Sequence, residues 1–207
     1  IQLGTATLGA KAAWSSDVAM TLNTNTTIKA ADATNAAFDI SLSGALTGAG
    51  GLTKTGAGTL SLTGANAYAG NTTVNEGTLQ VNSAYLDDAS TVSIDPLNNG
   101  TTKMRLDFAG NDTVSSLVLG GVVMGNGTYN ATTHPTFFDA AGTGSIVVSS
   151  GGSPYDTWSG GAAFDVDTNG DGVSNGVAFL LGAASPSANA LGLLPTATQS
   201  GGGLVLN

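Results

Sequence analysis

Residues 50–81 read GGLTKTGAGTLSLTGANAYAGNTTVNEGTLQV, and this stretch decides the fold. It holds two short apolar alternations, Leu-x-Leu at 60–62 and Leu-x-Val at 79–81, and a similar Ile-x-Leu stands at 40–42. Alternation with a period of two predicts half-buried β-strands, and the glycines between them predict turns. The alternations recur at intervals of roughly 20 residues, which predicts a coiled sheet whose rungs stack one on the next.

The composition of the whole chain favours the same architecture. Only 9% of the 207 residues are charged and 31 are Gly, so tight turns and a narrow interior are easy to build. Helix signals are sparse in residues 1–148, where short runs of Thr, Val, Leu, Ile and Ser alternate with Gly and Asn. A β-sandwich, with strands about every 8–12 residues, is the competing architecture. We expect an all-β solenoid of about seven rungs, each of about 20 residues.

Residues 50–81 closely resemble the autotransporter-associated β-strand repeat. The pattern of that family is G-L-x-K-x-G-x-G-x-L-x-L-x-G-x-N-x-Y-x-G-x-T-x-(V/I)-x-x-G-x-L, and this chain matches every position of it. At one position that this pattern leaves open, where the family usually has Gly, this chain has Asn71. The resemblance implies a right-handed parallel β-helix in a secreted or cell-surface passenger of a bacterium, and it implies no catalysis.

The side chains of this motif can be assigned to places in such a helix. Leu60, Leu62, Leu79 and Val81 are expected to point inward and to stack with the rungs above and below. Their neighbours in the alternation then face solvent.

Three further motif residues allow two interpretations. Asn66 is a buried corner residue with Tyr68 packed against the wall, or the two form an exposed ligand-binding pair. The first is favoured because stacked rungs leave backbone groups at the corners to be hydrogen-bonded. Lys54 is expected to be a solvated or locally paired charge rather than part of a site.

Residues 103–148 resemble, more loosely, the end piece that follows such repeats in related surface proteins. The segments 106–108 and 116–121 resemble its strands, and 127–129 and 142–148 resemble its closing hairpin. We expect this region to finish the β-helix of residues 1–148 and to cover its last rung, because an open rung is an adhesive edge.

Charge and residue inventory exclude several classes of function. Five Lys and Arg against fourteen Asp and Glu give a net charge of −9, which argues against nucleic acids and anionic membrane surfaces as partners. No apolar run approaches the ~20 residues of a membrane span. There is no Cys, and the one histidine, His134, lies in a polar segment expected to be a surface loop. A basic leader and a signal-like apolar segment are also missing, so we expect a mature or excised part of a longer secreted protein.

A second unit is predicted after a linker at 149–164, which begins with a Gly- and Ser-rich stretch. From Asp167 the sequence reads D-x-N-x-D-G-x-x-N and resembles the calcium loops of EF-hand and dockerin type. Alternating oxygen ligands followed by a Gly for the sharp turn are what Ca²⁺ requires. The predicted ligands are Asp167, Asn169, Asp171, the carbonyl of Val173, Asn175 directly or through water, and Asp165 as in the staggered loops of thrombospondin-type repeats.

One position departs from the calcium-loop pattern. Ala178 stands where the family places a bidentate carboxylate, which removes up to two ligands and one charge. The alternative is a metal-free turn held by Asx hydrogen bonds. A short helix is predicted at 175–181 with Gly182 after its end.

The wider unit at 165–186 resembles a C-terminal module of large secreted proteins in Verrucomicrobia-like bacteria. Residues 187–207 are expected to start a further β segment.

The most consistent function is structural. We expect a non-enzymatic extracellular or cell-surface segment that forms a stalk, matrix or self-assembling fibre. Residues 1–8 form an alternating strand and residues 203–207 an apolar segment, so either end of the chain is expected to pair with another copy, giving a homo-oligomer or filament.

Two other classes remain open. An adhesin or carbohydrate-binding passenger, with a polysaccharide as partner, needs exposed aromatics over a groove, and the chain has few aromatics, among them Trp14 and Trp158. A polysaccharide-acting enzyme needs acids and a base on one helix face. Asp87, Asp88, Asp107 and Arg105 are the candidates for that arrangement, although the adjacent Asp pair is more typical of a turn.

Overall fold

The chain consists of two compact units, Ile1–Ser150 and Gly151–Asn207, in the computed structural model. The described residues are 1–149, 165–194, 197–200 and 203–206. Of the predicted linker at 149–164, only residue 149 is among the described residues, and Trp158 lies outside them.

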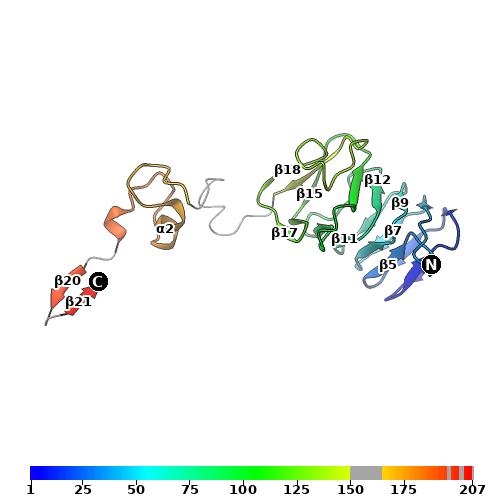
Figure 1. Ribbon diagram of the computed structural model, residues 1–207, viewed down its shortest axis with the longest axis horizontal. Helices are drawn as coiled ribbons and strands as arrows, with labels where there is room; N and C mark the ends of the chain where they lie inside the picture. The colour runs from blue at the N-terminus through cyan, green and yellow to red at the C-terminus, as the bar shows by residue number, and fades with distance from the viewer. Residues whose placement is uncertain (150–164, 195–196, 201–202, 207) are drawn as a thin grey trace. The chain divides into compact units, whose positions relative to one another are not determined.

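Three stacked sheets of mainly parallel strands form most of the first unit, and a smaller three-stranded sheet lies at its end (Figure 1). The four-stranded sheet holds β1 (Gln2–Leu3), β4 (Met20–Leu22), β7 (Leu46–Gly48) and β10 (Ala67–Tyr68). The seven-stranded sheet holds β2 (Thr7–Gly9), β5 (Thr26–Lys29), β8 (Leu52–Thr55), β11 (Thr72–Val74), β13 (Thr91–Ile94), β16 (Ser116–Leu119) and β17 (Val122–Val123). The five-stranded sheet holds β3 (Trp14–Ser16), β6 (Ile40–Leu42), β9 (Thr59–Leu62), β12 (Thr78–Val81) and β14 (Lys103–Leu106).

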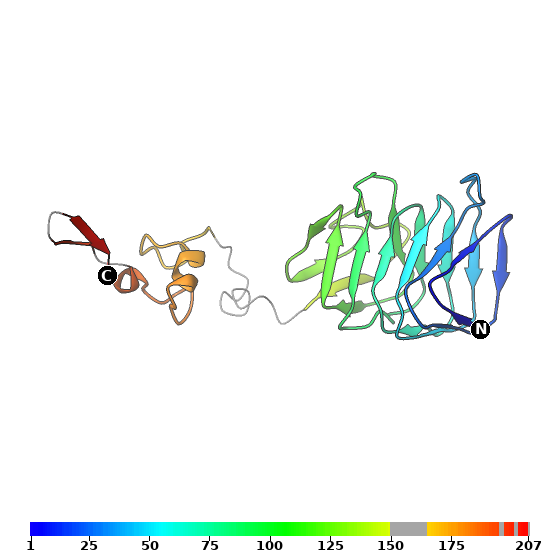
Figure 2. The same ribbon diagram turned by 90° about the horizontal axis from the view of Figure 1, so that it is seen from below.

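From β1 to β12 the chain visits the three sheets in turn, and each strand from β4 on pairs in parallel with the strand one rung earlier, so that the strands stack along the unit as Figure 2 shows. This is a parallel β-helix, so the predicted fold class is confirmed. Paired residues lie 19 or 20 positions apart through the repeat, as for Ile40, Leu60 and Leu79. The interval grows to 26 between Trp14 and Ile40 and to 25 between Leu79 and Met104, because loops are inserted there. The five-stranded sheet therefore has five rungs and the seven-stranded sheet stacks six parallel strands, which is fewer than the expected seven rungs.

The core is a set of rows that run along the helix axis, with one side chain from each rung. In β6, β9, β12 and β14 of the five-stranded sheet, every member of two such rows is no more than 2% exposed. The first row is Ile40, Leu60, Leu79 and Met104, and the second is Leu42, Leu62, Val81 and Leu106. The predicted inward direction of the four repeat residues among them is confirmed.

The corner at Asn66 also agrees with the sequence interpretation. Its Oδ1 accepts a hydrogen bond from the backbone N–H of Leu46 at 2.8 Å, and its Nδ2 donates to the carbonyl of Gly64 at 3.0 Å. Tyr68 is 1% exposed, and its hydroxyl lies 2.7 Å from the Thr72 hydroxyl. Asn66 therefore satisfies backbone groups of two rungs, and the alternative of an exposed ligand-binding pair is wrong.

Two glycines show why the repeat needs residues without a side chain at its corners. Gly77 has a φ of +65°, and a Cβ there would lie 2.5 Å from the carbonyl oxygen of Gly58 one rung below. A Cβ on Gly70 would lie 2.4 Å from the carbonyl carbon of Gly50. Successive corners stack too closely for any other residue.

The last rung is formed by β14, β15 (Asn111–Val114) and β16, and each of these strands has a partner on its outer side. β17 folds back antiparallel on β16. β19 (Ser145–Val148) adds in parallel to β15, and β18 (Gly127–Tyr129) pairs with β19. Phe138 forms a parallel bridge with Met104 of β14. Residues 103–148 therefore complete the last rung and pair with all three of its edges.

In its described residues, the second unit contains little regular structure. Its elements are α2 (Asn175–Leu180), a 3-10 helix (Leu191–Leu193) and an antiparallel pair of strands, β20 (Ala197–Ser200) and β21 (Gly203–Leu206). α2 follows Ser174, and Gly182 just after it has a φ of +82°. The helix predicted at 175–181 and its terminating glycine are confirmed.

Lys54 is the main surprise of the core. Its position in β8 stands in register with Ile28 and Val74, inside an otherwise aliphatic row. Its side chain is 0% exposed, so the interpretation of Lys54 as a solvated charge is wrong.

The buried ammonium of Lys54 is held by backbone carbonyls. Nζ donates to the carbonyl oxygens of Gly56 at 2.6 Å, Glu76 at 2.8 Å and Thr55 at 3.1 Å. Burial lowers the pKa of Lys54 from its ordinary 10.5 to about 8, against the opposing charges of Glu76 and Asp39. The ammonium therefore satisfies one corner of the helix, while its burial costs free energy at neutral pH.

This cost predicts an unusual dependence of stability on pH. Between pH 8 and 10 the unfolded chain keeps the Lys54 proton and the folded chain has lost it, so stability from this group rises with pH, by about 2 kcal/mol. Above pH 10 the trend should reverse, because burial raises the pKa of Tyr68 to about 12 and an unfolded tyrosine ionises first.

The measurement is urea unfolding across this pH range. Lys54→Met should lose the rise, whereas Lys29→Met, which changes an outward-facing lysine of β5, should keep it. The same pH slope in wild type and Lys54→Met would contradict the assignment.

Candidate functional site

The outward face of the five-stranded sheet carries side chains in register. Its first three rungs present short residues and its last two present long ones, so the relief of the surface changes along the helix. The row runs through Ser15, Ser41, Ser61, Gln80 and Arg105.

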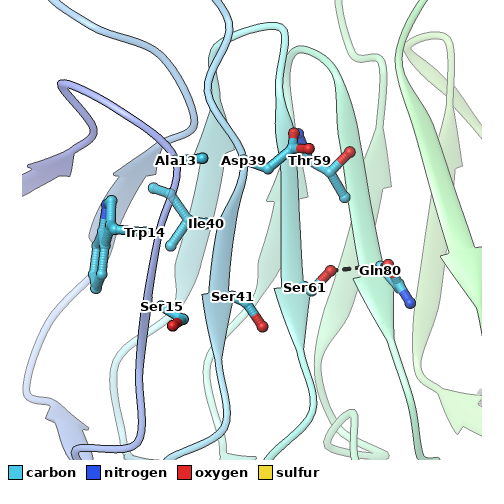
Figure 3. A pocket seen from close by; sticks show the side chains of 9 residues that line it. All are labelled: Ala13, Trp14, Ser15, Asp39, Ile40, Ser41, Thr59, Ser61 and Gln80. Carbon is cyan, nitrogen blue, oxygen red and sulfur yellow. Dashed lines mark hydrogen bonds between the residues drawn. The ribbon is translucent and has the colours of Figure 1, made fainter.

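A hollow of about 490 Å³ lies over the short residues of this row, from β3 to β12. Figure 3 shows Ser15, Ser41, Ser61 and Gln80 following one another across the strands, with Trp14 at one end. Asp39 and Thr59 line the hollow beside this row, and the backbone N–H of Thr59 donates to Oδ1 of Asp39 at 2.7 Å. The hollow exists because Ser side chains leave space that the later side chains of the row fill.

Hydrogen bonds fix the far wall of the hollow. The Ser61 hydroxyl donates to Oε1 of Gln80 at 2.8 Å, and Nε2 of Gln80 donates to Oδ2 of Asp107 at 2.6 Å. Arg105 Nε donates to the other oxygen of Asp107 at 2.7 Å, and the two side chains form an ion pair. This contact raises the pKa of Arg105. The wall is therefore a connected network across three rungs.

The acids considered for catalysis are only partly brought together. Arg105 and Asp107 are in contact, as described above. Asp87 instead caps a turn, where its Oδ1 accepts the N–H of Ala89 at 2.9 Å and its carbonyl accepts the N–H of Ser90 at 2.8 Å. In the described residues, no contact joins Asp87 or Asp88 to the Arg105 pair.

The Asp-rich loop of the second unit is held by its own hydrogen bonds. The Oδ1 of Asp167 accepts the N–H groups of Gly170 at 2.8 Å and Asp171 at 3.2 Å, and its Oδ2 accepts that of Gly172 at 2.7 Å. Asn169 accepts the N–H of Asp171 at 3.2 Å through Oδ1. These are Asx turns, in which side-chain oxygens hold the backbone of the loop.

Asp171 ties the loop to a distant part of the unit. Its Oδ2 accepts the N–H of Ala190 at 2.7 Å, and its Oδ1 accepts that of Val173 at 2.9 Å. These bonds, the one from Ala190 first, lower the pKa of Asp171. Asn169 adds a second tie, because its Nδ2 donates to the carbonyl of Ala188 at 2.8 Å.

The remaining predicted ligands take other places. Asn175 is 1% exposed and donates through Nδ2 to the Thr168 hydroxyl at 2.9 Å. Val173 and Ala178 are buried in a small apolar cluster. Asp165 is exposed.

This donor set fits calcium only in part. Among the described residues, no three acidic or histidine side chains converge so that they could hold a metal ion. The position that the calcium-loop pattern reserves for a carboxylate is Ala178, and its side chain is buried in the apolar cluster. Asp167, Asn169 and Asp171 supply oxygens of the right kind, and a calcium site built on them stays a prediction.

Sequence reasoning missed the hollow. It noted Trp14 only as one of a few dispersed aromatics. The available signal was that Ser15, Ser41 and Ser61 each follow an inward-facing strand residue, so that one outward row of the sheet is short.

Comparison with known families supports the repeat. Residues 52–81 match the model of the Passenger-associated-transport-repeat family. These residues are thus such a repeat, as the sequence predicted, and the repeat family is one of β-helical passengers, which are secreted or cell-surface proteins. Comparisons with curated proteins and with solved structures found no match. The resemblance of the second unit to dockerin and EF-hand loops stays a prediction. No helix in the described part of the chain is long and apolar enough to cross a membrane.

The loop geometry predicts weak calcium binding and a fold that does not depend on it. We expect a Kd in the range of roughly 10⁻⁴–10⁻³ M, because Ala178 supplies no carboxylate. Calorimetric titration of the whole chain with CaCl₂ measures it, and Asp167→Asn should remove the binding. Asp165→Asn reports separately whether Asp165 acts as the compensating ligand.

Amide spectra recorded with a chelator test the second half of this prediction. The signals of residues 165–194 should keep their dispersion, whereas Asp171→Asn should broaden them by weakening the bonds to Val173 and Ala190. Nanomolar calcium affinity, or collapse of the unit in chelator, would contradict the interpretation.

Proposed function

We propose that the first unit is a non-enzymatic structural segment of a protein on the outside of a bacterial cell, where its β-helix forms part of a stalk, matrix or fibre. The passenger-associated repeat at 52–81 supports export to the cell surface. The observation that carries the structural role is that the interactions of this unit serve mainly to join one rung to the next. The aliphatic rows, the corner amide of Asn66 and the ammonium of Lys54 all bridge neighbouring rungs.

Self-assembly is supported by the difference between the two ends of the helix. The last rung has partners on all three edges. β1, β2 and β3 are the outermost strands of their sheets, so their outer edge is the one at which a further strand can add. Apolar side chains stand beside this edge, with Ile1 68% exposed and Val18 43% exposed. A strand from a second copy of the chain suits such an edge.

This proposal predicts that charges on the first rung block association. A double variant, Gln2→Lys with Thr7→Lys, places two charges on the edge strands β1 and β2, where they would repel or be desolvated by an incoming strand. The wild-type chain should form larger species as its concentration rises, and the variant should remain monomeric. Sedimentation velocity and negative-stain electron microscopy measure this.

The matched control is Thr47→Lys with Thr73→Lys, which places the same charges on the inner strands β7 and β11. It should associate like the wild type. Strand addition at the first rung is not the assembly contact if the wild-type chain stays monomeric over the whole concentration series. The same conclusion follows if the control is as monomeric as the edge variant.

A further inference from the structure

We propose that the hollow over β3, β6, β9 and β12 binds a neutral, linear oligosaccharide. This inference goes beyond the structural role and does not depend on self-assembly, because the hollow lies on the outward face of the five-stranded sheet.

The shape of the hollow suits an extended chain of sugar rings. Its volume of about 490 Å³ lies within the range of small-molecule sites, roughly 300–1,000 Å³. Polar side chains recur along it once per rung, from Ser15 through Ser41 and Ser61 to Gln80, with a spacing of about 4.8 Å. That spacing is close to the length of one pyranose ring along an extended glycan. Neighbouring sugars would therefore meet equivalent groups.

The hollow offers hydrogen-bonding groups that the protein does not use. Within the described residues, the outward-facing hydroxyls of Ser15 and Ser41 have no hydrogen-bond partner. Gln80 and Ser61, by contrast, are held in place by their mutual bond and by Asp107 (Figure 3). A sugar, which carries donors and acceptors on every ring, can pair with both kinds of group.

Trp14 borders one end of the row through β3. Its side chain stands in register with the inward-facing Ile40 and packs against the core, so it supports the sheet beneath the hollow and is not a stacking surface on the outward face.

Charge favours a neutral glycan over an anionic one. Asp39 lines the hollow, and no lysine or arginine does. The two cations on the same sheet face are already engaged, since Lys103 Nζ donates to the carbonyl of Pro135 at 2.6 Å and Arg105 pairs with Asp107. The net charge of −9 adds a long-range repulsion against uronic acid or sulfated chains.

The test uses the whole chain carrying Trp158→Phe, so that Trp14 is the single tryptophan and its fluorescence reports on the hollow. The probes are three neutral hexasaccharides, cellohexaose, laminarihexaose and maltohexaose, and hexagalacturonate as the anionic counterpart. At least one neutral probe should give a saturable change, confirmed by calorimetry, and hexagalacturonate should bind about tenfold more weakly or less.

Two variants test whether the glycan binds in the hollow. Ser41→Phe fills the middle of the hollow and should weaken binding about tenfold or more. Ser93→Phe makes the same change at a partly exposed, outward-facing position of β13 in the seven-stranded sheet and should bind within about twofold of the parent. Circular dichroism checks that both variants fold.

Three results would overturn the proposal: no saturable change with any neutral probe up to roughly 10 mM, tighter binding of hexagalacturonate, or equal effects of the two Phe variants. None of these results bears on association at the first rung, because sedimentation velocity measures that association without any glycan.

Discussion

In-register stacking of inward side chains is the constraint on which the rest of this structure depends. Leu60 must lie over Leu79, and Leu62 over Val81, because a slip of one residue would turn every apolar row toward solvent. The corners have to accommodate this stacking, which is why Gly70 and Gly77 tolerate no side chain. In the seven-stranded sheet this stacking buries even a lysine, Lys54, between Ile28 and Val74. Its ammonium then hydrogen-bonds the backbone carbonyls of a corner.

The parts of the fold that short-range patterns determine could be predicted from the sequence. The repeat at 50–81, its inward leucines and the helix after Ser174 all follow from residue spacing and from turn or capping residues. The number of rungs does not follow from such patterns. Inserted loops change the interval between paired residues without changing the local alternation. Lys54 is instructive: alternation places it on the same face as Leu52, and only its charge argued for the surface. The periodicity of the strand outweighed the preference of the residue type.

The hollow could not be predicted because it arises from register over a long range. Ser15, Ser41 and Ser61 come from three rungs, and unequal loop lengths separate them in the sequence. Each alone is an ordinary outward residue of a strand. Their shortness matters only because they stand side by side and the next residue of the row, Gln80, is long. A surface of this type is a property of the stacked rungs and not of any single motif.

Hydrogen bonding separates the polar residues that build this protein from those that can act on something else. Asp167 and Asp171 have the composition of a metal loop, yet their oxygens accept backbone N–H groups and hold the turn. Asp112 does the same inside the β-helix, where one carboxylate oxygen accepts the N–H groups of Tyr85 and Leu86. A residue so engaged must give up a structural bond or share its oxygen before it can bind a ligand. The hydroxyls of Ser15 and Ser41 over the hollow hold no such structural bond. The outward face of the five-stranded sheet is therefore a place where this β-helix can acquire a binding function without weakening its core.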